Sequence, residues 1–431
     1  MKQKLLSIIC ILCMAVACFT ACGNNNNSGD AGNGNSPTQS AGNGSENNSG
    51  TTAAVNKYPD APKVDLNYEY HQEMEIIERS LLGTGHTERL QNVLNKAASG
   101  EDITIAYIGG SITYGYTVQP EECYAYKFTN WLETNFGIDV NYVNAGISGT
   151  PSVLGNLRVE RDVLVHDPDL VLVEFAVNDG YEDAFKNSYE SLLTKILAHE
   201  TEPAVMLLFC ITVDGHSCQE WMSQVGEHYQ LPMVSVVDSM NAEVEAGNIT
   251  FADYSKDGSH PTPQGHDWIT DYLVYCADTV YRMDFAETHY SLPEKAHYKN
   301  YYKDMTLYTN LTLPVDSYGS WTNGSGIAEF DAGWSYKPNE GNEPLTFTAD
   351  CRGMIILYRQ MPATNNMYGA IEVYVDGELT QSIYALDSSG WNNPTYNITF
   401  EKVSSETHTI EIKAKEGYEA LNFEILGIAY M

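Results

Sequence analysis

Between residues 103 and 237, short and continuously apolar segments alternate with segments in which apolar residues recur every three to four positions. The continuous segments lie at 103–108, 140–143, 170–175, 205–210 and 233–237. Strands that are buried on both faces have this composition, and the intervening periodicity is that of amphipathic helices. The alternation predicts five parallel strands joined by helices in a three-layer α/β domain, which a helix after Pro263 completes.

Beyond about residue 290 the chain changes to short strand-like segments separated by turns. These segments lie at 345–348, 355–358, 371–375, 396–400, 409–412 and 421–426. Asp376-Gly377 is a candidate hairpin turn, and no long helical periodicity interrupts the series. We therefore expect an α/β domain at 58–292 followed by an all-β sandwich of the jelly-roll type at 293–431.

The first 22 residues resemble a bacterial lipoprotein signal peptide. Lys2 and Lys4 precede an apolar run at 5–17, and Phe19-Thr20-Ala21-Cys22 is followed by glycine. The run is too short to span a membrane comfortably. We expect cleavage, lipidation of Cys22 and display as a cell-surface lipoprotein attached to the bacterial membrane. Phe19 departs from the usual leucine and Cys18 is a competing cysteine, so a secreted protein with a simply cleaved signal is the alternative.

Residues 23–57 consist almost wholly of Asn, Gly, Ser, Thr and Ala. Such a segment cannot bury enough apolar area to offset the entropy of ordering it. We expect a flexible linker, and about 35 residues of this kind span roughly 30–35 Å on average.

The bulk composition narrows the class of partner. The chain has 431 residues with 43% hydrophobic content, which is enough for two domain cores. Its 57 acidic and 23 basic residues give a formal net charge of -34, which argues against nucleic acid and favours a neutral substrate. Nothing in the composition indicates a protein partner.

The nine cysteines do not form an obvious disulfide framework. Three lie in the signal segment and Cys22 would carry lipid, which leaves an odd and scattered set of five: Cys123, Cys210, Cys218, Cys276 and Cys351. We expect mostly buried free thiols, while one bridge between Cys210 and Cys218 stays open.

The strand at 103–108 ends in Gly109-Gly110-Ser111, directly before a helical segment. A serine at the carboxyl end of a parallel strand lies on the rim where open α/β sheets bind ligands. The two glycines allow the sharp turn that exposes a nucleophilic hydroxyl. Gly-Gly-Ser is also an ordinary turn, so Ser111 needs support from other segments.

Three later segments supply that support. The segments at 144–150 and 174–179 follow strands at the same rim and contain a glycine turn and Val177-Asn178-Asp179. A glycine amide and an asparagine side chain can stabilise the oxyanion of acyl transfer, although a plain turn and a helix cap are the alternatives. The segment 257–263 places Asp257 three residues before His260, which suits a general base oriented by a carboxylate; a loop histidine beside a capping aspartate is the alternative.

In this order the four segments resemble those of the SGNH hydrolases, the broad GDSL lipase/esterase group, over about residues 100–285. The resemblance implies a flavodoxin-like parallel sheet and an ester hydrolase that needs neither metal nor cofactor. It implies that Ser111 is the nucleophile, His260 the base and Asp257 the acid that orients it. It also implies an oxyanion hole made by the Ser111 amide, the Gly149 amide and the Asn178 side chain.

Gly110 departs from the family pattern, because the family name places aspartate there; the departure concerns local hydrogen bonding of the loop. His266 competes weakly as a base, and we expect it to serve in packing or to support the site without touching the substrate. Asp214, His216 and Cys218 alternate as metal ligands can, but they lack a fourth ligand.

The fold does not name the ester. Export, an attached β-sandwich and the presence of 30 Tyr and 6 Trp favour a glycan substrate, and no apolar lid segment favours a lipid. We expect an O-acetyl esterase that deacetylates polysaccharide, such as xylan or mannan fragments, through an acyl-serine intermediate. The alternatives are an esterase of peptidoglycan or another envelope glycan, a lipase or thioesterase, and a non-catalytic glycan-binding lipoprotein.

Overall fold

The computed structural model describes residues 52–431. The predicted signal peptide, the lipidation at Cys22 and nearly all of the predicted linker therefore lie outside the described residues. The described residues belong to one compact unit. None of the helices in the described part of the chain combines the length and apolar character needed to cross a bilayer.

The first half of the described chain contains a six-stranded sheet with the order β1-β6-β5-β4-β2-β3. Five strands are parallel: β2 (Ile103–Gly109), β3 (Val140–Gly146), β4 (Leu170–Glu174), β5 (Ala204–Phe209) and β6 (Met233–Ser235). The predicted parallel sheet is confirmed. The sequence missed β1 (Leu81–Gly83), which pairs antiparallel with β6, because three half-buried residues carry no readable period.

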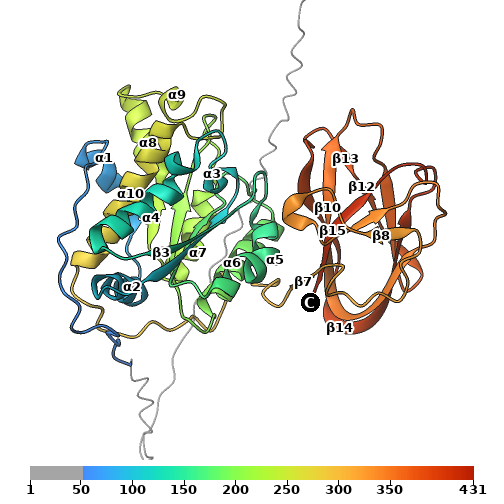
Figure 1. Cartoon of the computed structure of the whole chain (residues 1–431), viewed down its shortest axis with the longest axis horizontal. Helices are drawn as coiled ribbons and strands as arrows, with labels where there is room; N and C mark the ends of the chain where they lie inside the picture. Colours follow the sequence, from blue (N-terminus) through green and yellow to red (C-terminus); the bar gives the residue numbers. More distant parts are fainter. Residues whose placement is uncertain (1–51) are drawn as a thin grey trace, which may run out of the picture. The chain divides into compact units, whose positions relative to one another are not determined.

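Helices cover both faces of this sheet, as the continuous apolar strands predict. They are α1 (Met74–Arg79), α2 (Glu88–Ala98), α3 (Ser111–Tyr114), α4 (Tyr124–Phe136), α5 (Ser152–Asp162), α6 (Asp183–Leu197), α7 (Gln219–His228), α8 (Val236–Ala246), α9 (Phe251–Tyr254) and α10 (Pro263–Arg282). One core places α2, α4 and α10 against one face, and a second core places α6 and α7 against the other. Figure 1 shows α4 and α10 separated from α5 and α6 by the strands.

The second half contains a nine-stranded sheet, antiparallel apart from the two-residue strand β13, with the order β12-β11-β14-β10-β15-β9-β8. Its strands are β7 (Thr306–Tyr308), β8 (Trp321–Asn323), β9 (Trp334–Tyr336), β10 (Leu345–Pro362), β11 (Ala370–Val375), β12 (Glu378–Tyr384), β13 (Leu386–Asp387), β14 (Asn393–Ala414) and β15 (Glu424–Tyr430). The all-β prediction and the hairpin turn at Asp376-Gly377, between β11 and β12, are confirmed.

Two predicted breaks in this sheet are wrong. The segments at 345–348 and 355–358 belong to the single strand β10, and those at 396–400 and 409–412 belong to β14. The pairing of β10 with β14 shifts register between Cys351 and Gly353. A bulge absorbs the irregular residues without ending the strand, so the local loss of apolar alternation marks a bulge here and not a turn.

An apolar cluster joins the two halves of this compact unit. Ile147, Leu154 and Leu157, from β3 to α5, contact a group on the β side: Tyr302, Met305, Ile327, Phe330, Ile355, Leu357, Leu426 and Ala429. The buried Lys195 of α6 donates to the carbonyl oxygen of Met305 at 2.6 Å. The last helix of the first half ends at Arg282 and the first strand of the second begins at Thr306.

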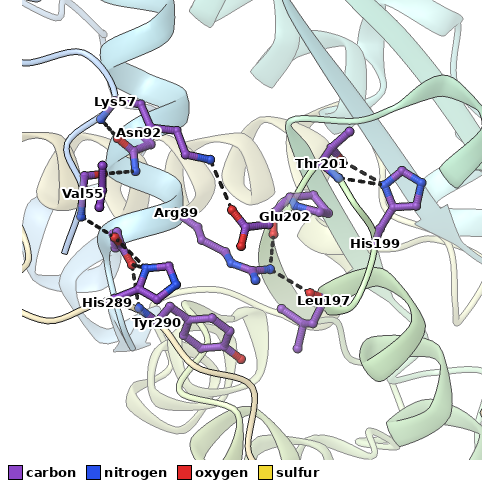
Figure 2. Close-up of polar contacts among 12 residues, drawn as sticks. Val55, Lys57, Arg89, Asn92, Leu197, His199, Thr201, Glu202, His289 and Tyr290 are labelled. Carbon is purple, nitrogen blue, oxygen red and sulfur yellow. Dashed lines mark hydrogen bonds and ion pairs between the residues drawn. The ribbon is translucent and has the colours of Figure 1, made fainter. Parts of the chain in front are cut away.

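The start of the described chain is fixed to α2 at the amino ends of the parallel strands. The Val55 N–H donates to the buried carboxylate of Glu88 at 2.8 Å, which also accepts from the Tyr290 N–H at 2.6 Å and faces His289. Asn92 accepts from the Lys57 N–H and donates to the Val55 carbonyl (Figure 2). Residues 52–57 are thus held at the sheet edge opposite the carboxyl ends of the strands.

Candidate active site

Ser111 begins the short helix α3, directly where β2 ends. The two preceding glycines do not adopt the left-handed conformation. Instead, a Cβ on Gly109 would lie 2.2 Å from Thr113 Oγ1, and a Cβ on Gly110 would lie 2.1 Å from Asn178 Oδ1. The close approach of neighbouring atoms therefore requires glycine at both positions, a reason that adds to the sharp turn expected from the sequence. The Gly110 contact also accounts for the departure from the family pattern, because an aspartate side chain does not fit there.

The structure brings Ser111, His260 and Asp257 together, although 149 residues separate the first two. His260 Nε2 lies 2.9 Å from Ser111 Oγ, and His260 Nδ1 lies 2.7 Å from Asp257 Oδ2. Because Nδ1 faces a carboxylate, it carries the ring proton, and Nε2 accepts the hydroxyl proton of Ser111. Hydroxyl, imidazole and carboxylate form one hydrogen-bonded chain.

The loop that carries His260 is fixed at both ends. Asp257 Oδ1 accepts from the backbone N–H groups of Ser259 and His260, at 3.1 and 2.9 Å. Thr262 caps α10 by accepting from the Gly265 N–H at 3.1 Å, and Pro263 occupies the first helical position. The imidazole also lies against the Tyr116 ring, with ring centroids 4.6 Å apart. His260 is held from its carboxylate side and from one ring face.

The electrostatics favour a permanently ionised Asp257. Partial burial acts to raise its pKa, but the hydrogen bonds from His260 and Ser259 outweigh burial and lower the pKa to about 2. His266 behaves in the opposite way, because burial, with Lys127 and His260 nearby, lowers its pKa to about 3. His266 is thus neutral and buried, and its Nδ1 accepts from the Tyr124 N–H at 3.2 Å. The expectation that it serves packing agrees with this position.

The other predicted site residues line the same pocket as the serine. This pocket has a volume of about 280 Å³. It is lined by Ser111, Tyr116, Ser148, Gly149, Val177, Asn178, Ser259, His260 and Trp391. Gly149 has φ 71°, a conformation that glycine adopts without strain. The structure therefore brings together every residue predicted for the nucleophile, base, orienting acid and oxyanion hole.

Trp391 is a pocket residue that the sequence did not reveal. It lies in the loop before β14, the residue is 54% exposed, and a Cβ on Gly149 would lie 2.7 Å from its ring. The next residue, Asn392, has φ 78° and accepts from Arg359 Nε. The only sequence signal for Trp391 is the presence of a tryptophan in the turn-rich segment Ser-Ser-Gly-Trp-Asn-Asn-Pro. Nothing in that run indicates a partner 242 residues away at Gly149.

Three ionisable side chains, those of Glu174, Asp179 and Arg158, are buried near the pocket, and the sequence alone gave none of them a role. Burial, with a contribution from Asp179, raises the pKa of Glu174 to about 8, and burial raises the pKa of Asp179 to about 7. Arg158 of α5 is fully buried and donates to the backbone carbonyl oxygens of Gly109 and Ala145. A charged residue within an apolar strand end or helix face is the signal that points to such groups.

The alternating Asp214, His216 and Cys218 have separate protein partners. Asp214 accepts from the Thr212 hydroxyl, while His216 Nε2 lies 3.1 Å from the Asp179 carbonyl oxygen. Cys218 donates to that same carbonyl oxygen. Over residues 52–431 no group of three or more His, Cys, Asp or Glu side chains is arranged to hold a metal ion. Cys123, Cys210, Cys218, Cys276 and Cys351 are free and buried.

Comparison with known proteins adds a family to this geometry. Residues 107–268 match the model of the GDSL-like Lipase/Acylhydrolase family. An arylesterase of Vibrio mimicus is 27% identical over 181 residues, which are 41% of this chain and 90% of that protein.

Solved structures resemble both halves of the described chain. A two-domain esterase (CEX) active on acetylated mannans is 28% identical, with a TM-score of 0.74, covering 82% of this chain and 98% of that one. The same esterase co-crystallized with mannopentaose aligns with a TM-score of 0.74, 28% identity and coverage of 84% and 98%. With the pocket geometry, these likenesses lead to one conclusion: the chain carries a GDSL-like lipase/acylhydrolase domain and is a carboxylic ester hydrolase.

Proposed function

We propose that this esterase removes O-acetyl groups from a polysaccharide or oligosaccharide through an acetyl-serine intermediate. The observation that carries the proposal is the hydrogen-bonded chain Ser111–His260–Asp257 in a pocket that also presents the Trp391 indole. Hydroxyl, imidazole and carboxylate in this order perform acyl transfer on several unrelated folds.

In the first half of the reaction, Ser111 Oγ attacks the ester carbonyl carbon while His260 Nε2 takes its proton. Negative charge develops on the carbonyl oxygen, where the N–H groups of Ser111 and Gly149 and the Asn178 amide donate hydrogen bonds. The bond to the sugar oxygen then breaks, and the imidazolium returns the proton to that oxygen. The acetyl group remains on Ser111, and the sugar leaves with a free hydroxyl.

In the second half, His260 takes a proton from water as the water oxygen attacks the acetyl-serine carbonyl. The tetrahedral intermediate uses the same three donors, and its collapse releases acetic acid and restores the Ser111 hydroxyl. Asp257, with its pKa of about 2, remains ionised throughout and stabilises the transient imidazolium. These steps use the chain's own residues and water.

Two observations support an acetylated glycan as the substrate. A cavity of about 280 Å³ lies below the usual range for ligand pockets and suits a short acyl group better than a fatty acyl chain. The half-exposed Trp391 ring at its mouth offers a flat apolar face to a sugar ring. The mannan-active esterase with the same two-part architecture favours the same class.

We place this activity outside the cytoplasm. The proposal rests on the amino-terminal sequence: a charged start, an apolar run, Cys22 and a linker rich in Asn, Gly and Ser. In this proposal the protein is anchored by lipid at the cell surface, and the alternative is a secreted protein. Metabolic labelling with a fatty-acid analogue, compared between the wild type and a Cys22→Ala variant, tests it; labelling that persists in the variant contradicts anchoring at Cys22.

Acetate release from acetylated mannan, xylan, peptidoglycan and a simple aryl acetate tests the activity, with Ser111→Ala as the control. We expect the wild type to release acetate from a plant glycan and the variant to be inactive. Rapid quenching followed by mass spectrometry should find the acetyl group on Ser111. A preference for peptidoglycan identifies an envelope-glycan esterase, and a preference for long-chain esters identifies a lipase. Equal inactivity of both proteins on every ester contradicts the proposal and leaves a binding protein.

A further inference from the structure

Arg158 lies immediately behind the two loops that line the pocket. It belongs to α5, and its side chain has no solvent exposure. Nη1 donates to the Ala145 carbonyl oxygen at 2.6 Å, and Nη2 donates to the Gly109 carbonyl oxygen at 3.1 Å. Gly109 ends β2 two residues before Ser111, and Ala145 lies in β3 four residues before Gly149. One planar guanidinium therefore bridges the ends of the two strands that lead to the nucleophile and the glycine loop.

A second hydrogen bond reinforces this bridge. The Gly109 carbonyl oxygen also accepts from the Ile147 N–H at 3.1 Å. The Gly109 carbonyl oxygen is therefore bound both by the backbone of the loop that leads to Gly149 and by Arg158, which also binds the Ala145 carbonyl oxygen. The Gly146 and Gly109 positions leave no room for side chains, since an added Cβ would lie 2.3 Å from Tyr114 N and 2.2 Å from Thr113 Oγ1. Because the atoms are packed so closely, the hydrogen bonds of Arg158 and Ile147 set the spacing between the loop after β2 and the loop after β3.

A purely stabilising role does not require an arginine here. Burying a cation is costly, and an apolar residue of similar volume in such a place is often as stable or more stable. Burial lowers the pKa of Arg158, which Asp162 opposes by pairing with Nη1 at 3.1 Å, and an arginine stays protonated in proteins. The guanidinium supplies two donors in fixed relative geometry, which lysine or methionine cannot do.

We propose that Arg158 is a positioning residue for the oxyanion hole: by joining the Gly109 and Ala145 carbonyls, it sets the separation of the Ser111 and Gly149 amides. The inference rests on the proposed serine mechanism. It assigns Arg158 no contact with substrate. Its effect falls on transition-state stabilisation, because donors must sit within a fraction of an ångström of where the oxyanion forms.

Steady-state hydrolysis of an aryl acetate by Arg158→Met and Arg158→Lys tests the inference, because this substrate makes no use of the sugar contacts. We expect Arg158→Met to lower kcat about 10- to 100-fold and to leave KM nearly unchanged. This decrease is smaller than the decrease in kcat caused by removing a direct oxyanion donor. Arg158→Lys, which can reach one carbonyl, should fall between. The pH dependence of kcat/KM should keep its midpoint, because the His260–Asp257 pair is untouched.

A transition-state analogue separates positioning from simple loss of fold. Methylboronic acid forms a tetrahedral anion on Ser111, and we expect its Ki to rise by the same factor as kcat/KM falls. The matched control is Arg161→Met, because Arg161 also pairs with Asp162 but stacks on Phe330 away from the carbonyls; its kcat should equal that of the wild type. Thermal unfolding of each variant reports the folded fraction. If Arg158→Met does not fold, the same measurements are made on Arg158→Lys.

The outcomes are distinct. If kcat per folded molecule and Ki both stay at wild-type values in Arg158→Lys and Arg158→Met, Arg158 only supports the fold and the inference is wrong. A change in KM or in the pH midpoint without a change in Ki also overturns it. If the wild type hydrolyses no ester and binds no boronate, it is the proposed serine mechanism that fails.

Discussion

Gly110 shows how one missing side chain decides the geometry of the pocket. The Asn178 amide occupies the space that a side chain at residue 110 would need, since an added Cβ would lie 2.1 Å from its Oδ1. The absence of a methyl group therefore lets the Asn178 amide reach the pocket. A residue that looks like a loss relative to the family pattern is a packing requirement in this chain.

Gly110→Ala should therefore act on catalysis through Asn178. We expect kcat for an aryl acetate to fall about 100-fold or more, the effect of losing one oxyanion donor, with a smaller change in KM. Gly83→Ala is the control, because an added Cβ there meets nothing within 4 Å. A Gly110→Ala enzyme with unchanged kcat would show that Asn178 does not serve as a donor.

Glu174 gives the protein a pH-dependent stability. Burial and Asp179 raise its pKa to about 8, so between pH 4.5 and 8 the folded state retains a proton that the unfolded state has released. Its contribution to the free energy of unfolding is complete below pH 4.5 and is lost as the pH rises towards 8, by at most about 1.4 kcal/mol per pH unit.

Glu174→Gln should remove this dependence on pH, because a neutral amide resembles the protonated acid and does not titrate. Urea unfolding at several pH values should show a shallower decline from pH 5 to 8 in this variant than in the wild type. Glu200→Gln, at an exposed position, should leave the decline unchanged. Equal slopes for all three proteins would mean that Glu174 is already ionised in the folded state.

Among the elements, α10 matters most to the site because its first turn follows His260 directly. Thr262 Oγ1 accepts from the Gly265 N–H and donates to the Asp253 carbonyl at 3.0 Å, so it fixes both the helix start and α9. Thr262→Ala should lower the free energy of unfolding by about 1 kcal/mol. It should also lower kcat by loosening the loop, whereas Thr262→Ser keeps the hydroxyl and should retain both. Urea unfolding and aryl acetate kinetics measure the two effects, and an unaltered Thr262→Ala enzyme would refute the role of the cap.

The elements that the sequence predicts well are those whose signal is local. Each parallel strand is a continuous apolar run followed by a polar segment, so these runs alone predict that Ser111, Gly149 and Asn178 lie at one rim. The exceptions depend on distant partners. Strand β1 exists because β6 offers it an edge, and β10 continues through Cys351 because β14 pairs with both sides of the bulge. Arg158 and Trp391 acquire their positions only through the packing of separate segments.

At the scale of the whole molecule, the pocket is completed by a residue from the second half of the chain. Trp391→Ala should therefore raise KM for an acetylated mannan about two- to tenfold, the effect of losing a stacking contact of about 0.5–1.5 kcal/mol. Kinetics on a simple aryl acetate should not change, and Trp391→Phe, which keeps a flat ring, should restore most of the affinity. Equal loss on both substrates would assign Trp391 to support of Gly149 and not to sugar binding.

The anchoring of residues 52–57 on α2 has a consequence for access by a large substrate. Val55 lies near the amino ends of the parallel strands, whereas the pocket with Ser111 lies at their carboxyl ends. In the protein that we propose is anchored through Cys22, the chain therefore joins the unit of residues 52–431 on the side opposite Ser111. A long, branched or insoluble glycan can therefore approach Ser111 from the side of the molecule that is opposite the attached segment.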